Sequence, residues 1–150
     1  MPLAIRRATS ADAPTVVDFN ARLAQESEDK TLDRAVLTSG VAQALADEHK
    51  CRYFLAEDAG AVVGQMMVTY EWSDWRNGWI WWIQSVYVVA EARRCGVFKA
   101  LYEHIRQTAL TQGVVALRLY VDQSNDGAKK TYARMGMEAT EYVVLEKCPV

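Results

Sequence analysis

The chain has 150 residues, of which 51% are hydrophobic and 24% charged, and its formal net charge is -2 at pH 7. These values are typical of a soluble globular protein, and they predict one domain over residues 1–150. A general nucleic-acid binder carries a strong basic excess, so the near-neutral balance argues against that class.

The three cysteines, Cys51, Cys95 and Cys148, lack the paired spacing of a zinc site or a disulfide framework. We therefore expect reduced thiols and no metal. The first seven residues lack the apolar core of a signal peptide, and no stretch approaches membrane-spanning length. These features predict a cytoplasmic protein without a membrane or nucleic-acid partner.

Periodicity and turn residues predict an alternation of strands and helices along the chain. Thr9 or Ser10 is expected to cap the first helix, with Pro14 in its first turn. In chain order the pattern predicts a strand, two helices, three strands, a helix, a strand, a helix and a strand, over residues 3–8, 10–26, 33–48, 53–57, 61–72, 79–89, 97–111, 115–121, 127–134 and 138–146.

Asn77-Gly78 lies between two apolar runs and is typical of a two-residue hairpin turn, because both central residues of a type I′ turn need positive φ. Such a turn places Glu71 opposite Gln84, unless a bulge shifts the register.

A basic, glycine-containing stretch, residues 93–99, directly follows an apolar run ending at Val89 and opens a helical pattern. The first turn of a helix leaves main-chain N–H groups without partners and favours phosphate oxygens. Gly96, lacking a Cβ, permits close approach. The stretch matches neither the P-loop nor the dinucleotide fingerprint.

Arg93-Arg94-Cys95-Gly96-Val97-Phe98 resembles the pyrophosphate loop of the GNAT acetyltransferase superfamily, Gln/Arg-x-x-Gly-x-Gly/Ala. Phe98 stands where the second small residue is usual, and Ala90 stands where a proline is common. A second family motif, Asn-x-x-Ala-x-x-x-Tyr-x-x-x-Gly-Phe, is matched by Asn125, Ala128, Tyr132 and Gly136-Met137. The motifs cover the second half of the chain, while the first half agrees in the order of its elements.

The resemblance implies an α+β fold with a mixed, mostly antiparallel sheet, splayed between the fourth and fifth strands, with helices on both faces. It also implies transfer of an acetyl group from acetyl-CoA by direct attack of a primary amine, from a small molecule or a peptide. Lys129 or Lys130 would reach the nucleotide phosphate. The implied cofactor-binding residues are Val86, Tyr87, Val88, Arg93, Arg94, Cys95, Gly96, Val97, Phe98, Lys99, Asn125 and Tyr132.

Tyr132 occupies the position whose phenol commonly protonates the departing thiolate in this family; packing of its ring on the sheet is the alternative. A phenol of pKa about 10 is a weaker acid than a thiol near 8.5, so a hydrogen bond to the developing charge is the useful contribution. Glu71, Glu26 and Glu28 are candidates for the proton acceptor. Each also fits a solvated surface carboxylate, and a water chain is equally open.

Five tryptophans crowd the predicted hairpin and cannot all face one side of a sheet. Most are expected in the core or at a subunit contact, and one or two could face a cationic acceptor. With the apolar last strand, they favour a homodimer. An acyl-enzyme on Cys95 is a competing route. A non-catalytic acyl-CoA sensor is the alternative function, and it would need neither Tyr132 nor a proton acceptor.

Overall fold

The computed structural model describes residues 2–150, which divide after Leu119 into two compact units. The first unit contains one five-stranded sheet in which neighbouring strands follow chain order and only β4 and β5 run parallel. Its strands are β1 (Ala4–Arg7), β2 (Arg52–Asp58), β3 (Ala61–Ser73), β4 (Gly78–Val88) and β5 (Ala116–Leu119). This is the expected mixed, mostly antiparallel α+β architecture.

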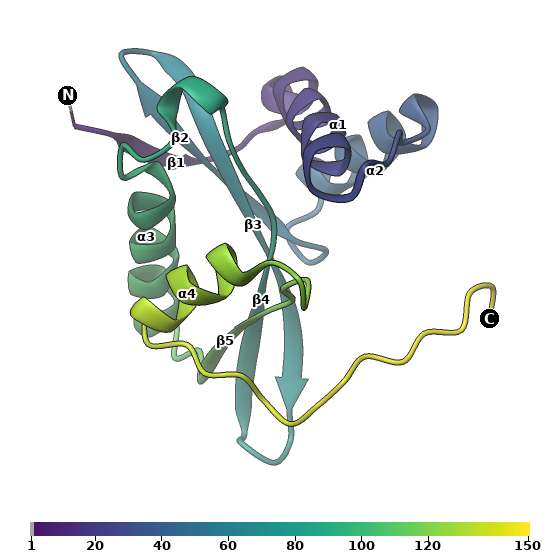
Figure 1. Cartoon of the computed structure of the whole chain (residues 1–150), viewed down its shortest axis with the longest axis vertical. Helices are drawn as coiled ribbons and strands as arrows, with labels where there is room; N and C mark the ends of the chain where they lie inside the picture. The colour runs from purple at the N-terminus through teal and green to yellow at the C-terminus, as the bar shows by residue number, and fades with distance from the viewer. Residues whose placement is uncertain (1) are drawn as a thin grey trace. The chain divides into compact units, whose positions relative to one another are not determined.

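Helices cover both faces of this sheet, α1 (Ala13–Glu28) and α2 (Arg34–Ala46) on one and α3 (Val97–Thr111) on the other (Figure 1). The alternation of side chains along β2 explains the two layers. Leu55 belongs to a buried cluster with residues of α1 and α2, whereas the neighbouring Phe54 meets His104 of α3 edge-on at 5.5 Å between ring centroids.

Local signals place the helix starts close to where the sequence predicts them. Thr9 precedes a 3-10 turn, Ser10–Asp12, and its main-chain N–H donates to the Asp12 carboxylate at 2.7 Å. Pro14 lies in the first turn of α1. Asp33 caps α2 by accepting from the N–H groups of its first turn at 2.9 and 3.1 Å.

The predicted register of the β3–β4 hairpin is wrong. Ser73 pairs with Gly78 and Glu71 with Ile80, so the turn contains four residues, 74–77. Gly78 is therefore a strand residue, and a Cβ on it would lie 2.4 Å from Cγ1 of Val115. The glycine is needed for close packing here, which explains why the Asn-Gly signal misled the turn assignment.

The tryptophans divide between the two faces and the turn, as alternation requires. Trp81 alone among them is buried, while Trp72 and Trp79 meet edge-on at 5.3 Å and are about half exposed. Trp75 is 93% exposed in the turn. At the hairpin tip the rings therefore lie outside the core, and the expected subunit contact stays a prediction.

The second unit contains α4 (Asp126–Arg134) and an extended segment up to Val150. The sequence predicts a strand over residues 138–146, but these residues form neither strand nor helix in the described chain. The apolar run Tyr142–Leu145 is exposed. Strand propensity alone does not form a strand when no partner strand supplies the hydrogen bonds.

Candidate functional site

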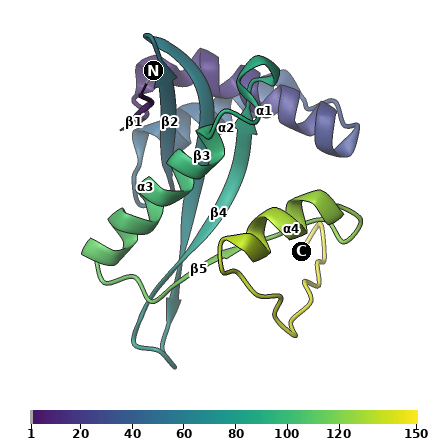
Figure 2. The ribbon, with the colours of Figure 1, turned by 60° about the vertical axis from the view of Figure 1, so that its left-hand side comes forward.

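Strands β4 and β5 separate halfway along β4, as the resemblance implies. Their parallel pairing runs only from Ile80 to Ile83 on β4 and from Ala116 to Leu119 on β5. Beyond Ile83, β4 stays paired with β3 on its other side. Figure 2 shows the two strands diverging. The main-chain groups of residues 84–88 on this edge have no partner strand in the described unit, so an amide-bearing ligand could pair with them.

A bulge coincides with the separation. Gln65 of β3 pairs with Tyr87 and Met67 pairs with Gln84, so Ser85 and Val86 together oppose a single residue of β3. Ser85 has a φ of 52°. Such a bulge bends the strand that carries the extra residue, and here it bends β4 at the point where β5 leaves it.

The loop after β4 turns sharply into α3. A 3-10 turn, Ala90–Ala92, is followed by Arg94 with φ 63° and Gly96 with φ 82°. Gly96 is the N-cap of α3 and has no side chain to occupy the first-turn N–H groups. Nothing lies within 4 Å of the place where its Cβ would stand. The start of the helix is therefore open to an anion.

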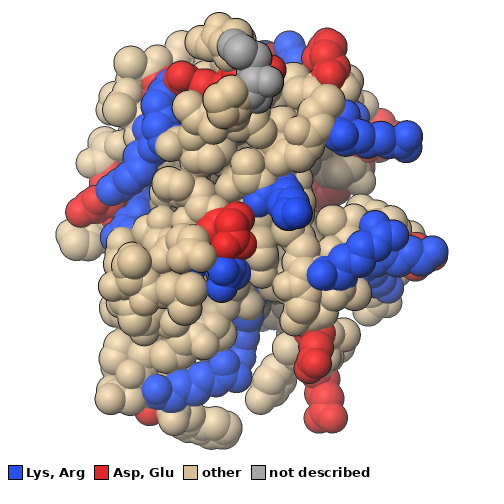
Figure 3. All heavy atoms as spheres, turned by 90° about the vertical axis from the view of Figure 1, so that its left-hand side faces the viewer, with Lys and Arg blue, Asp and Glu red and all other residues tan. Residues whose placement is uncertain are grey.

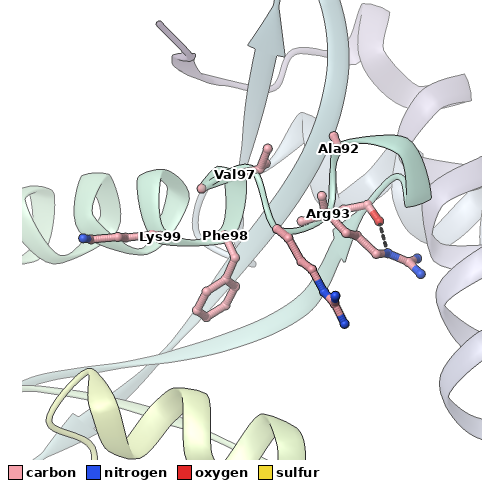
Figure 4. A pocket seen from close by; sticks show the side chains of 8 residues that line it. Ala92, Arg93, Val97, Phe98 and Lys99 are labelled. Carbon is pink, nitrogen blue, oxygen red and sulfur yellow. Dashed lines mark hydrogen bonds between the residues drawn. The ribbon is translucent and has the colours of Figure 1, made fainter.

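A hollow of about 260 Å³ lies at this helix start, and Figure 4 shows it from close by. It is lined by Val88, Ala92, Arg93, Arg94, Gly96, Val97, Phe98 and Lys99. The Phe98 ring stacks with that of Tyr102 at 6.3 Å between centroids. The ring therefore lies along α3, which leaves the helix start accessible although this position usually holds a small residue.

The two arginines of the loop differ in their contacts. Arg93 donates from Nε to the Val88 carbonyl at 3.0 Å and from Nη2 to Glu26 at 2.7 Å. Its guanidinium also lies 5.6 Å from the centre of the Tyr87 ring. Arg94 makes no hydrogen bond or ion pair within the described residues. Arg94 is therefore a cation of this loop that remains available to a phosphate.

Glu26 connects the end of α1 to this loop. The Tyr87 hydroxyl donates to its Oε2 at 2.6 Å, while Arg93 donates to its Oε1. The hydrogen bond from Tyr87, followed by that from Arg93, lowers the pKa of the Glu26 carboxyl. Burial and the same hydrogen bond raise the pKa of Tyr87. The carboxylate is therefore ionised at neutral pH and holds two donors in place.

Glu71 lies elsewhere, on β3 near the hairpin. It accepts from Nε1 of Trp82 at 2.8 Å and lies 3.6 Å from Nη1 of Arg118 on β5. The contacts of Glu26 and Glu71 with β4 are five residues apart, which corresponds to about 16 Å along a strand. The structure does not bring the two candidate carboxylates together.

The remaining candidate residues lie in the second unit. Asn125 is the N-cap of α4 and accepts from the Ala128 N–H at 3.0 Å. Tyr132 is half-buried, and burial raises the pKa of its hydroxyl. Lys129 donates to the Gln123 carbonyl. The Asn-x-x-Ala spacing of the family motif therefore has a local explanation, because Asn125 caps α4 at the Ala128 N–H. The contacts of these residues with a cofactor stay a prediction.

Cys95 is the residue on which the alternative acyl-enzyme would form. Cys95 is exposed, and its thiol donates to the Arg93 carbonyl at 3.5 Å.

Among residues 2–150, no three histidine, cysteine or acidic side chains gather as metal ligands. No helix in this part of the chain has the length and apolarity needed to cross a membrane. On the face shown in Figure 3, basic side chains alternate with acidic ones and uncharged areas.

Residues 16–137 match the family model described as Acetyltransferase (GNAT) family. A solved "possible acetyltransferase" from Clostridium difficile 630 is 43% identical, with 100% of this chain and 99% of that chain covered, at a TM-score of 0.93. A "predicted acetyltransferase with acetyl-CoA" from Clostridium acetobutylicum is 18% identical, with 97% and 96% covered and a TM-score of 0.78. An aminoglycoside acetyltransferase from an uncultured soil metagenomic sample is 19% identical, with 99% and 96% covered and a TM-score of 0.77.

No curated protein matches the chain significantly. The match over most of the sequence, together with a 43% identical relative of the same length and fold, is decisive. The splayed strands and the open helix start agree with it. The chain belongs to the GNAT family of acetyltransferases.

Proposed function

We propose that the protein is an acetyl-CoA-dependent N-acetyltransferase in which a primary amine attacks the thioester directly. One observation carries the proposal: the open start of α3 lies directly after the edge of β4 that β5 leaves unpaired. A ligand with phosphates at one end and an amide-bearing arm at the other needs both features. Coenzyme A has this shape and chemistry.

The donor site combines main-chain and side-chain groups. The N–H groups of residues 97–99 and the Arg94 guanidinium would hold the diphosphate. Main-chain groups of residues 86–88 would pair with the amides of the arm. Asn125, with Lys129 or Lys130, would contact the donor from the second unit. Arg93 would act mainly by fixing the loop, because Glu26 and the Val88 carbonyl already engage its guanidinium.

The reaction forms an N–C bond between the amine and the acetyl carbon and breaks the C–S bond. The sulfur takes the bonding electron pair and, finally, a proton. Tyr132 would donate a hydrogen bond to the departing sulfur. Burial raises the pKa of this hydroxyl, so it keeps its proton across the neutral range and remains a donor.

The amine must lose a proton before or during attack, because an amine of pKa about 10.4 is almost wholly protonated at neutral pH. Glu71 and Glu26 are the candidate acceptors of this proton, directly or through water, and the two donors that lower the pKa of Glu26 make it the weaker base. Each carboxylate already accepts from other side chains in the structure. An acyl-enzyme on Cys95 has no part in this scheme, because the amine attacks the thioester directly.

The proposal extends to a single acetyltransferase domain over residues 1–150 that works in the cytoplasm without a metal. Its acceptor is a small-molecule or peptide amine, and the protein is a homodimer. Sedimentation at several concentrations tests the dimer. An unbiased screen for acetylated products tests the acceptor.

The direct test measures thiol release from acetyl-CoA across a broad panel of amines, together with the melting temperature in the presence of acetyl-CoA. We expect turnover with at least one amine and a rise in melting temperature. Arg94→Ala should weaken acetyl-CoA binding about tenfold, while Arg76→Ala, in the hairpin turn, should leave it unchanged. A rise in melting temperature without turnover on any amine would refute the enzyme and favour an acyl-CoA sensor.

A further inference from the structure

The bulge in β4 needs support from outside the strand ladder. Ser85 holds a left-handed main-chain conformation, which costs free energy for a residue with a side chain. Because Ser85 and Val86 together oppose one residue of β3, the regular exchange of main-chain hydrogen bonds is interrupted there. The displaced main-chain groups require other partners.

The side chain of Gln65 supplies one of these partners. It is fully buried, and its Nε2 donates to the Ser85 carbonyl at 3.0 Å. Since a carbonyl oxygen only accepts, the nitrogen of the carboxamide must face it, which fixes the orientation of the side chain. The Gln65 amide therefore replaces a hydrogen bond that the ladder loses at the bulge.

Further polar groups hold Gln65 in place from α1 and β2. Its Nε2 lies 3.4 Å from Oδ1 of Asn20, and Asn20 donates from Nδ2 to the Tyr53 hydroxyl at 3.1 Å. Burial raises the pKa of Tyr53, so its hydroxyl stays protonated at neutral pH while it accepts from Asn20. Buried polar side chains of α1, β2 and β3 thus form one network, which reaches the Ser85 carbonyl through Gln65.

Core packing does not explain a glutamine at this position. Oε1 of Gln65 is buried without a hydrogen-bond partner in the described residues, which is unfavourable for a carbonyl oxygen. An apolar side chain would avoid that cost. The Nε2 contact with Ser85 is what an apolar side chain cannot provide.

We propose that Gln65 is a positioning residue for the acyl donor, an inference that rests on the proposed function. By holding the bulge at Ser85, it directs the main-chain groups of residues 86–88 away from β5 and toward the donor. Without the bulge, the residues after Ser85 would shift by one position and exchange faces. Tyr87 would then leave Phe19, whose ring centre lies 5.2 Å from its own, and lose Glu26.

The test compares Gln65→Met with Val68→Ala, a control at another fully buried position of β3. Calorimetry gives the Kd of acetyl-CoA, and steady-state kinetics give kcat and KM. Gln65→Met should raise Kd and KM about tenfold and change kcat less than about threefold. Val68→Ala should change Kd less than about twofold, although it also lowers the melting temperature.

An unchanged Kd in Gln65→Met, or an equal rise in both variants, would overturn the inference. If Gln65→Met does not fold, hydrogen exchange of the Gln65 side-chain amide in the wild type tests the network instead. The Gln65 side-chain amide protons should exchange as slowly as core main-chain amides, and fast exchange contradicts the network. If the wild type binds no acetyl-CoA, both the proposed function and this inference are overturned. If the wild type binds acetyl-CoA and Gln65→Met binds it with the same Kd, this inference alone is overturned.

Discussion

Substituting Glu26 tests whether its carboxylate holds the loop before α3 or accepts the proton of the amine. Glu26 accepts hydrogen bonds from Tyr87 at 2.6 Å and Arg93 at 2.7 Å, and these contacts lower its pKa below the ordinary value of 4.5. A base acting directly on an amine of pKa about 10.4 would take its proton uphill by about six pKa units, or about 8 kcal/mol. The two donors make this transfer still less favourable.

We therefore expect Glu26 to hold the loop rather than to take the proton. In Glu26→Gln, KM for acetyl-CoA should rise about threefold to tenfold, because Arg93 loses its charged partner, and kcat should change less than about threefold. The stability loss should stay within about 1 kcal/mol, since both side chains of the pair are more than 40% exposed.

Glu71→Gln provides the comparison, because Glu71 contacts Trp82 and Arg118 instead of the loop. The assay is steady-state kinetics against pH with an amine substrate identified by the product screen. A drop in kcat of a hundredfold or more in Glu26→Gln, with KM for acetyl-CoA unchanged, would refute the reasoning and make Glu26 the base.

Three further substitutions, of Tyr132, Gly78 and Asp12, have defined expected outcomes. Tyr132→Phe should lower kcat about tenfold to hundredfold with little change in KM for acetyl-CoA, while Tyr142→Phe in the same unit should change neither; equal kcat in the two variants contradicts the role of Tyr132. Gly78→Ala should destabilise by about 1–3 kcal/mol in urea titrations, because its Cβ would meet a side chain at 2.4 Å, whereas Gly40→Ala in α2 meets nothing within 4 Å and should stabilise by about 0.5–1 kcal/mol. Arg6 holds the pKa of Asp12 at about 2, below its ordinary 3.8, so this pair stabilises the fold above about pH 4 and stops doing so as the pH falls through 2. Asp12→Asn should therefore cost about 1–2 kcal/mol at pH 7 and progressively less below pH 4; a cost independent of pH would contradict this.

The sequence predicts the conformation of the loop before α3 well because this conformation depends on local chemistry. A β-branched run, a glycine and an amphipathic pattern are adjacent in the chain, and α3 begins and ends at the predicted residues, Val97 and Thr111. The start of α3 needs only a residue that tolerates a φ of 82° and offers no Cβ, and glycine at position 96 meets both needs. Such requirements are visible in a few neighbouring residues.

The hairpin shows where local signals fail. Asn77 does adopt a positive φ of 48°, as the turn motif requires, but Gly78 belongs to the strand because Val115 packs against it. Val115 lies 37 positions later in the chain, so no local pattern contains this contact. The predicted and observed partners of Glu71, Gln84 and Ile80, nevertheless share a face of the sheet, because the register error is an even number of residues.

Gln65 is the clearest case of a residue that sequence reasoning misses. Its position in an apolar strand reads as ordinary alternation, and its importance arises from a bulge on another strand, twenty residues away. The bulge in turn coincides with the separation of β4 from β5, at the edge where the donor is proposed to bind. In the proposed donor site, the charged loop would supply the affinity for phosphate, whereas the direction of the donor would depend on a neutral, buried hydrogen bond. A search for charged or reactive side chains would find the first of these features and overlook the second.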